Sequence, residues 1–281
     1  MTRYDFPDDA WTLIFPMLPP ERGTSRGGRP YFAHRQVMNG IFWVLCSGAP
    51  WRDLPERYGH WKTIYSRFNL WSKAGVMNNF FNKLLQILDE KELVDWDVIA
   101  LDGSNIRALK AAAGAKKKHP DELDDHGLGR FRGGFGTKIH LATDVAGLPL
   151  SFCLSSGQAH ESQYAKGSLH RVGVIRKSGC LKSRPKAVLA DKGYSGHSFR
   201  YHFKIKGKIA VTPFKSNEKA SREKRRKFNR QLYKKRNVVE RCFAALKENR
   251  RIATRSEKTA RNYLSMLKLT AVRLFLRRLL G

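Results

Sequence analysis

The sequence predicts an α/β protein in which a small all-α region precedes a mixed β-sheet flanked by helices. Residues 1 to about 90 carry helical apolar periodicity, and short β-rich runs follow them. Two of these runs flank an Ala146-Gly147 turn, which is typical of a hairpin, and helical and strand patterns alternate after it. This order predicts a mixed sheet with helices on its faces. We therefore place one domain at residues 1–92 and a second at residues 93–281.

The helical region contains a candidate helix-turn-helix. QVMNGIFWVLCSG predicts an apolar helix that ends at Gly48. We expect a short helix around Trp51 to Tyr58, a turn at Gly59 and a second helix from Trp61 to about Lys73. Four residues at helical spacing in this second helix form an apolar stripe: Trp61, Ile64, Phe68 and Trp71. The other side offers candidate DNA contacts, namely Lys62, Ser66, Asn69 and Lys73. An ordinary solvated helix face is the alternative.

Strand patterns dominate the second region. VIAL predicts a buried strand that ends on Asp102, and AVLA predicts another that runs into Asp191. KGKIAVTPF predicts a further short strand, whereas HESQYAKGSLHRVGVI has a helical pattern. Two long basic helices close the chain, one carrying Glu240 and one from Thr259 to Leu280. We expect loops at KAAAGAKKKHPDELDDHGLGRFRGGFG and at the charge run KSNEKASREKRRK.

The charge of the chain predicts a polyanionic partner. The 281 residues are 41% hydrophobic, which suffices for a core, yet the formal charge is +30, with a pI near 10.4. Residues 201–281 hold 25 Lys and Arg against 5 Asp and Glu, whereas the first hundred hold 12 against 11. We therefore expect nucleic acid to bind mainly to the C-terminal half. An acidic membrane surface is the alternative.

Other features exclude further classes of protein. The cysteines are far apart and form no C-x-x-C pair, so buried thiols in a reducing compartment are expected rather than a zinc site: Cys46, Cys153, Cys180 and Cys242. MTRYDFPDDAW does not resemble a signal segment, which favours an intracellular, cytoplasmic location. No stretch reaches the roughly 18 uncharged apolar residues of a membrane span. The final YLSMLKLTAVRLFLRRLL predicts an amphipathic helix that docks on a core, with membrane binding as the alternative.

Three carboxylates carry the predicted chemistry. Asp102 and Asp191 each follow an apolar strand, where an ionised carboxylate is costly unless it is paired or metal-bound. Glu240 is an isolated acid in a basic segment, and a single helix would place it on one face with Tyr233, Arg236 and Lys247. Such carboxylates can converge on hard divalent cations, and two metal ions can clamp a phosphodiester undergoing displacement. Taken singly, either aspartate could instead be a turn or cap residue.

These residues resemble bacterial insertion-sequence transposases. The four residues Tyr233, Arg236, Glu240 and Lys247 match the signature Y-x-x-R-x-x-x-E-x-x-x-x-x-x-K of that class. IALDGSNIRA and VLADKGYSG look like the regions that supply the two aspartates of an Asp-Asp-Glu triad. GIFWVLCSGAPWRDLPERYGHWKTIYSRF and GRFRGGFGTKIHLATD are similar to the insertion-sequence-five family in particular. One departure is Asp-Gly-Ser at residues 102–104, where Asp-Ser-Thr is more usual.

The resemblance implies a ribonuclease-H-like catalytic core with two Mg²⁺ or Mn²⁺ ions in each active site. Asp102 would bridge both ions, and Asp191 and Glu240 would each complete one. Tyr233, Arg236 and Lys247 would hold DNA near the scissile phosphate. The implied enzyme binds terminal inverted repeats of double-stranded DNA as a homodimer or higher oligomer, cleaves the element ends and transfers the 3′-hydroxyls to target DNA. No small-molecule substrate is implied.

Two alternatives to a transposase stay open: a related metal-dependent nuclease or resolvase without strand transfer, and a non-catalytic DNA-binding repressor. Secondary site candidates also have alternatives. GRFRGGFGTK could contact DNA through Arg130, Arg132 and Lys138, or be a flexible approach to the hairpin. His160 could orient water or phosphate near the active site, and its neighbour Glu161 could lie there too; a local cap or surface role is equally open. Asp144 is a turn former or a further catalytic acid. HPDELDDH could bind a metal, although a polar loop fits better (His119, Asp121, Glu122, Asp124, Asp125, His126).

Overall fold

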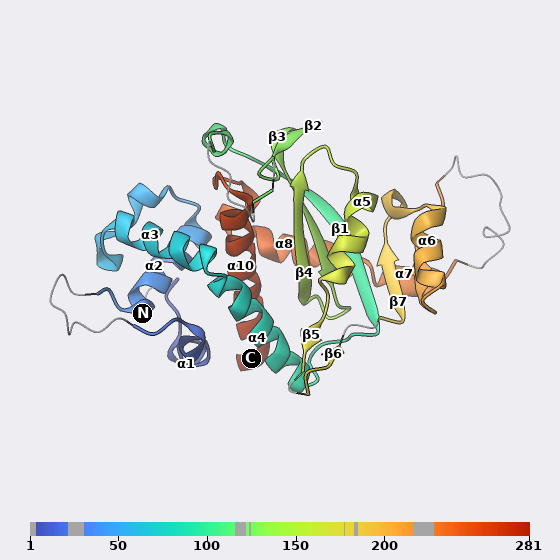
Figure 1. Cartoon of the computed structure of the whole chain (residues 1–281), viewed down its shortest axis with the longest axis horizontal. Helices are drawn as coiled ribbons and strands as arrows, with labels where there is room; N and C mark the ends of the chain where they lie inside the picture. Colours follow the sequence, from blue (N-terminus) through green and yellow to red (C-terminus); the bar gives the residue numbers. More distant parts are fainter. Residues whose placement is uncertain are drawn as a thin grey trace. The chain divides into compact units, whose positions relative to one another are not determined.

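The computed structural model describes residues 4–21, 31–115, 122–123, 125–176, 178–182, 185–215 and 228–281 (Figure 1). Three members of the candidate metal cluster, His119, Asp121 and Asp124, lie outside the described residues, as does most of the predicted loop KSNEKASREKRRK. The chain divides into two compact units. The first comprises Met1–Leu84, Ala108–Leu123 and Leu246–Gly281, and the second comprises Leu85–Arg107 and Asp124–Ala245. The boundary at residue 92 remains a proposal.

The first unit is helical. It contains α1 (Asp8–Ile14), α2 (His34–Ser47), α3 (Trp61–Lys73), the larger part of α4 (Val76–Glu90), α9 (Arg250–Ala253) and α10 (Ala260–Leu280). The packing of α2 against α3 and α9, and of α10 against α3, α9 and α1, brings both ends of the chain into one core. The C-terminal helix buries most of its length, as expected for a helix that docks on a core. Within the described residues, none of the helices combines the length and the apolarity that a membrane crossing requires.

The predicted helices at residues 34–73 are confirmed, except for one. α2 ends at Gly48, whose φ of 72° forms the left-handed cap, and α3 has the predicted bounds. The short helix expected at Trp51 to Tyr58 is wrong. Two separate 3₁₀ turns, Trp51–Asp53 and Glu56–Tyr58, occupy this segment because Pro55 has no N–H to donate and restricts the preceding residue to an extended backbone.

The second unit contains a six-stranded mixed sheet. Its strands are β1 (Val98–Arg107), β2 (Gly129–Phe131), β3 (Gly134–Thr143), β4 (Pro149–Ser156), β7 (Ala187–Ala190) and β8 (Ile209–Val211). The order is β2-β3-β1-β7-β8, and β4 also pairs with β3. β1 is antiparallel to β3 and parallel to β7, so the sheet is mixed, as predicted. A separate small hairpin joins β5 (Val174–Ile175) to β6 (Leu181–Lys182).

The predicted hairpin around Ala146-Gly147 is confirmed, and β2 forms within a predicted loop. The strand predicted to end on Asp102 is longer than expected: β1 continues to Arg107 because its far half pairs with β3, with Asp102 opposite Leu141. The sequence GSNIR after the aspartate has little apolar character, so periodicity alone could not extend the strand.

Helices cover the sheet. α5 (Glu161–His170) packs on β3 and β4, and α6 (His197–Lys204) packs on β8 (Figure 1). The single helix expected through residues 233–247 is interrupted, because α7 (Arg230–Lys234) and α8 (Asn237–Lys247) are separate. Consecutive i→i−3 hydrogen bonds from Lys235 and Arg236 tighten the backbone between them into a 3₁₀-like turn. A helical first region and a mixed sheet with flanking helices confirm the predicted fold class.

Candidate active site

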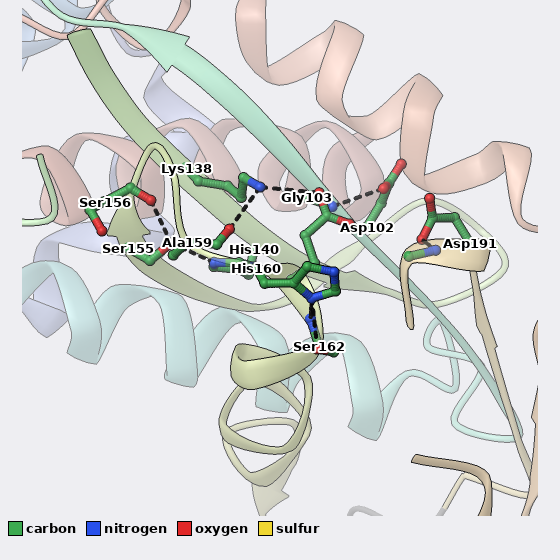
Figure 2. Close-up of polar contacts among 12 residues, drawn as sticks. Asp102, Gly103, Lys138, His140, Ser155, Ser156, Ala159, His160, Ser162 and Asp191 are labelled. Carbon is green, nitrogen blue, oxygen red and sulfur yellow. Dashed lines mark hydrogen bonds and ion pairs between the residues drawn. The ribbon is translucent and has the colours of Figure 1, made fainter. Parts of the chain in front are cut away.

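Asp102 and Asp191 occupy equivalent places on two adjacent parallel strands. The pairing of β1 with β7 ends with Leu101 opposite Ala190. Asp102 directly follows Leu101, and Asp191 directly follows Ala190. Both carboxyl groups therefore lie where β7 ends, although the two residues are far apart in sequence (Figure 2). Asp191 follows the carboxyl end of β7, whereas Asp102 lies within β1, which continues to Arg107.

Burial dominates the electrostatics of Asp102. Its Oδ1 accepts a hydrogen bond from the Gly103 N–H at 2.8 Å, and its Oδ2 accepts one from Arg236 at 3.1 Å. Desolvation raises the pKa of Asp102 above its ordinary value; the two donors oppose the rise, and the charge of Asp191 adds to it. Asp191 accepts a hydrogen bond from the Gly193 N–H at 2.7 Å. A cation beside the two aspartates would relieve the repulsion between their charges.

Glu240 is joined to Asp102 through a shared arginine. Arg236 donates from Nη1 to Asp102 and from Nη2 to Glu240 Oε1. The side chains of Arg236 and Asp102 are each 17% exposed, whereas that of Glu240 is 51% exposed. Burial lowers the pKa of Arg236, but the charges of Asp102, Tyr233 and Glu240 outweigh it and raise the pKa above its ordinary value. Arg236 therefore acts as the counter-ion of two of the three predicted carboxylates.

Glu161, the first residue of α5, adds a fourth carboxylate. A Cβ added to Gly103 would come within 2.7 Å of Glu161 Oε1, and one added to Gly193 would come within 3.4 Å of Oε2. Desolvation raises the pKa of Glu161; Lys138 opposes the rise, and the charges of Asp191 and Asp102 add to it. The carboxylate that sequence reasoning held as a secondary candidate thus lies beside both aspartates.

Lys138, predicted as a DNA contact, lies on β3 with its side chain only 12% exposed. Its Nζ is 3.5 Å from Glu161 Oε1. The same group donates a hydrogen bond to the Ala159 carbonyl at 2.9 Å (Figure 2). In this arrangement the ammonium group is the counter-ion of Glu161. A role toward DNA stays a prediction.

Tyr194 is a residue that sequence reasoning missed. It ends the 3₁₀ turn that follows Asp191 and is 2% exposed. Burial raises the pKa of its hydroxyl well above the ordinary value, and the charges of Glu161, Asp102 and Asp191 add to the rise. An aromatic residue three positions after a candidate ligand, in the segment DKGYSG, was the available signal.

The other residues of the signature and its surroundings are placed as follows. The Tyr233 ring centroid lies 5.8 Å from the Arg236 guanidinium carbon, and Lys247 is the last residue of α8. His160 caps α5 by accepting a hydrogen bond from the Ser162 N–H, which is the local role left open for it. Asp144 is fully buried and accepts hydrogen bonds from the N–H groups of the β3–β4 turn, so its structural role as a turn former accounts for it.

The remaining candidate DNA contacts belong to β2 and its surroundings and to α3. Arg130 and Arg132 are exposed on and beside β2. On α3, Lys62, Ser66 and Lys73 are exposed, whereas Asn69 accepts hydrogen bonds from Arg261 and Asn262. The apolar side of α3 is buried at Ile64, Phe68 and Trp71.

The donor set suits a hard divalent cation. All four carboxylates offer oxygen ligands, which Mg²⁺ and Mn²⁺ prefer. In the ion pairs of the described residues, two cations, Lys138 and Arg236, face these four acids. As the described side chains stand, no three His, Cys, Asp or Glu residues converge closely enough to hold one metal ion. The guanidinium of Arg236 forms ion pairs with both Asp102 and Glu240 and supplies the positive charge between them.

Comparison with known families decides the identity. Residues 95–275 match the family described as "Transposase DDE domain", and residues 6–81 match "Putative transposase of IS4/5 family". The chain belongs to the IS4/5 family of DDE transposases. The first match covers the whole sheet with α5 to α9 and most of α10, and the second covers α1 to α3 and the start of α4.

Curated relatives agree with this family. "Insertion element IS402 uncharacterized 16.2 kDa protein" of Burkholderia cepacia is 38% identical over 108 residues, 37% of this chain and 74% of the relative. "Putative transposase for insertion sequence element IS402" of the same organism is 30% identical over 48% of this chain and 60% of its own. "Putative transposase for insertion sequence element IS6501" of Brucella ovis is 28% identical over 50% of this chain and 98% of its own. No solved structure matches the chain.

Membership of a DDE transposase family implies a catalytic transposase that acts on DNA and uses divalent metal ions. The predicted recognition of an insertion-sequence transposase is therefore confirmed. The carboxylates Asp102, Asp191 and Glu240, chosen from the sequence as the DDE set, stay predictions at the level of individual residues.

Proposed function

We propose that this transposase cleaves DNA at the ends of its insertion element and joins the freed 3′-hydroxyls to target DNA. The observation that carries the proposal is that Asp102, within β1, and Asp191, directly after β7, follow paired residues of two adjacent parallel strands, with Glu240 linked to Asp102 through Arg236. Divalent ions, when bound, would activate water and stabilise the charge that develops on the scissile phosphate. Asp102, Asp191 and Glu240 are the proposed residues that hold two Mg²⁺ or Mn²⁺ ions.

Basic and aromatic groups beside the carboxylates would position DNA. Arg236 can release its carboxylates to pair with a phosphate, because a guanidinium binds either group through the same forked donors. Tyr233 lies against Arg236 and can hydrogen-bond or stack, and Lys247 continues the α8 face two turns beyond Glu240. The exposed Arg130 and Arg132 and the polar side of α3 are proposed contacts to the DNA flanks.

Joining two element ends requires that both be held together. We therefore propose that at least two copies of the chain assemble on paired terminal inverted repeats. The formal charge of +30 supports strong, salt-dependent phosphate binding.

The test is a reaction of purified protein with Mg²⁺, a labelled DNA that carries the repeats flanking the gene, and a plasmid target. The proposal expects nicks at the repeat ends and labelled DNA covalently joined to the plasmid, both absent with Glu240→Gln. Cleavage without joined product would indicate a nuclease or resolvase instead. Repeat binding that is identical in wild type and in Asp102→Ala, with no cleavage by either, would indicate a repressor.

A further inference from the structure

Glu161 lies in a space that Gly103 leaves free, and its Oε2 also lies near Gly193. Gly103 follows Asp102 directly, and Gly193 is the second residue after Asp191. A Cβ at Gly103 would meet Glu161 Oε1, Cδ and Cγ at 2.7, 2.9 and 2.9 Å, closer than ordinary van der Waals contact. The glutamate side chain therefore packs against the backbone at Gly103, and a side chain at position 103 would displace it.

The position of Glu161 is costly without a compensating charge. Its side chain is 20% exposed, and it shares the site with Asp102 and Asp191. Lys138 balances one negative charge, and Arg236 balances part of the charge on Asp102 and Glu240. In the ion pairs that the structure describes here, four carboxylates face two cations, an excess of two negative charges in a chain whose formal charge is +30. Such a concentration of acid in a basic protein fits a divalent cation.

We propose that Glu161 is a fourth carboxylate ligand of the divalent-cation site, in addition to Asp102, Asp191 and Glu240. Two observations support it: the packing of the Glu161 side chain on Gly103, and the excess of negative charge in the ion pairs that the described residues form here. The inference rests on the proposed metal-dependent function. Lys138 holds the glutamate in place until a cation takes over its charge.

The test measures Mn²⁺ binding to the full-length protein without DNA. Binding is monitored by the electron paramagnetic resonance signal of free Mn²⁺, which disappears when the ion is bound. Glu161→Gln, which keeps the shape and removes the charge, is expected to weaken Mn²⁺ binding at least tenfold, since even the loss of an outer partner of a ligand costs about 10–100-fold. Gly103→Ala is expected to weaken binding in the same direction, because its methyl group displaces the carboxylate without changing any charge. Asp97→Asn, which removes an exposed carboxylate on the same unit, is the matched control and leaves binding unchanged.

A purely structural role for Glu161 predicts a different pattern. If the glutamate only neutralises Lys138, the double variant Lys138→Met with Glu161→Gln regains wild-type Mn²⁺ binding, and that result overturns the proposal. If Glu161 is a ligand, the double variant stays weak. Circular dichroism and thermal unfolding in EDTA show whether each variant is folded. If Glu161→Gln does not fold, Gly103→Ala provides the test.

Failure of this inference is distinguishable from failure of the proposed function. Wild-type Mn²⁺ affinity in Glu161→Gln, together with weakened binding in Asp102→Asn, overturns the fourth ligand and leaves the three-carboxylate site standing. Wild-type affinity in Asp102→Asn overturns the metal site itself, and the fourth ligand with it.

Discussion

Replacing Arg236 by glutamine should change stability and metal affinity in opposite directions. The arginine donates to Asp102 at 3.1 Å and also to Glu240, and its side chain is 17% exposed. Two unit charges about 4 Å apart attract each other by roughly 4 kcal/mol at an effective dielectric constant near 20. The cost of desolvating the charged groups offsets part of this attraction. A hydrogen bond to a charged group contributes about 1.5–3 kcal/mol to stability. We expect Arg236→Gln to lower the free energy of unfolding by about 2 kcal/mol in EDTA.

The same substitution should strengthen metal binding. Without the guanidinium, Lys138 is the one cation left in the ion pairs that the described residues form with these carboxylates, and the site becomes more negative by one charge. A gain of about 1.4 kcal/mol corresponds to tenfold tighter binding. We therefore expect Arg236→Gln to bind Mn²⁺ at least tenfold more tightly than wild type in the absence of DNA, even though its metal-free form is less stable.

The assay combines urea unfolding in EDTA with a Mn²⁺ titration of the same preparation. Arg241→Gln is the matched control, because Arg241 is an exposed arginine on α8, the helix that begins directly after Arg236. It should change neither quantity beyond about 0.5 kcal/mol. A variant of Arg236 that loses stability and also binds Mn²⁺ more weakly, or with unchanged affinity, would refute the view that this arginine is a counter-ion that a metal ion replaces.

Three further predictions concern stability. Asp89→Ala should cost about 3 kcal/mol in urea unfolding, because the buried carboxylate accepts hydrogen bonds from three donors that would be left unpaired (Trp96, Arg176 and Lys182); an unchanged midpoint would contradict this. Although burial opposes it, these hydrogen bonds hold the pKa of Asp89 below its ordinary value. The stabilisation by Asp89 is therefore complete above the pKa that this carboxyl has in the unfolded state, and it is lost as the pH falls through its pKa in the folded state. Asp89→Asn should thus flatten the profile of stability against pH below about pH 4. Glu257→Gln should cost about 3 kcal/mol by thermal unfolding, since it leaves the buried Arg251, 2.6 Å away, without its counter-ion; a melting temperature equal to wild type would argue against it.

Elements with local signals were predictable from the sequence. Helix α3 follows from its apolar stripe, α2 ends at the glycine that its C-cap requires, and the β3–β4 hairpin follows from its turn. Elements set by partners were not. β1 runs past Asp102 only because β3 pairs with it, and the turn between α7 and α8 has no proline or glycine to announce it.

The site was predictable as a set of residue types and only partly as an arrangement. Asp102 and Asp191 stand out because each follows an apolar run, and Glu240 because it is acidic among bases. The position of Glu161 depends on the packing of α5 over β1 and β3, which no local pattern encodes. Lys138 was predicted to contact DNA because it is a basic residue in the glycine-rich segment GRFRGGFGTK, whereas the fold turns its ammonium group toward Glu161. The grouping of Leu246–Gly281 with the N-terminal helices is likewise a matter of long-range packing.

The central claim is that distant carboxylates hold divalent cations for phosphodiester chemistry. It is tested most directly by counting the Mn²⁺ ions retained per chain when the protein is bound to a DNA carrying one element end. We predict two ions for wild type and fewer for Asp102→Asn, Asp191→Asn and Glu240→Gln, each still bound to the DNA. Retention of no Mn²⁺ by the wild-type complex, or of the same number by the variants, would contradict the account.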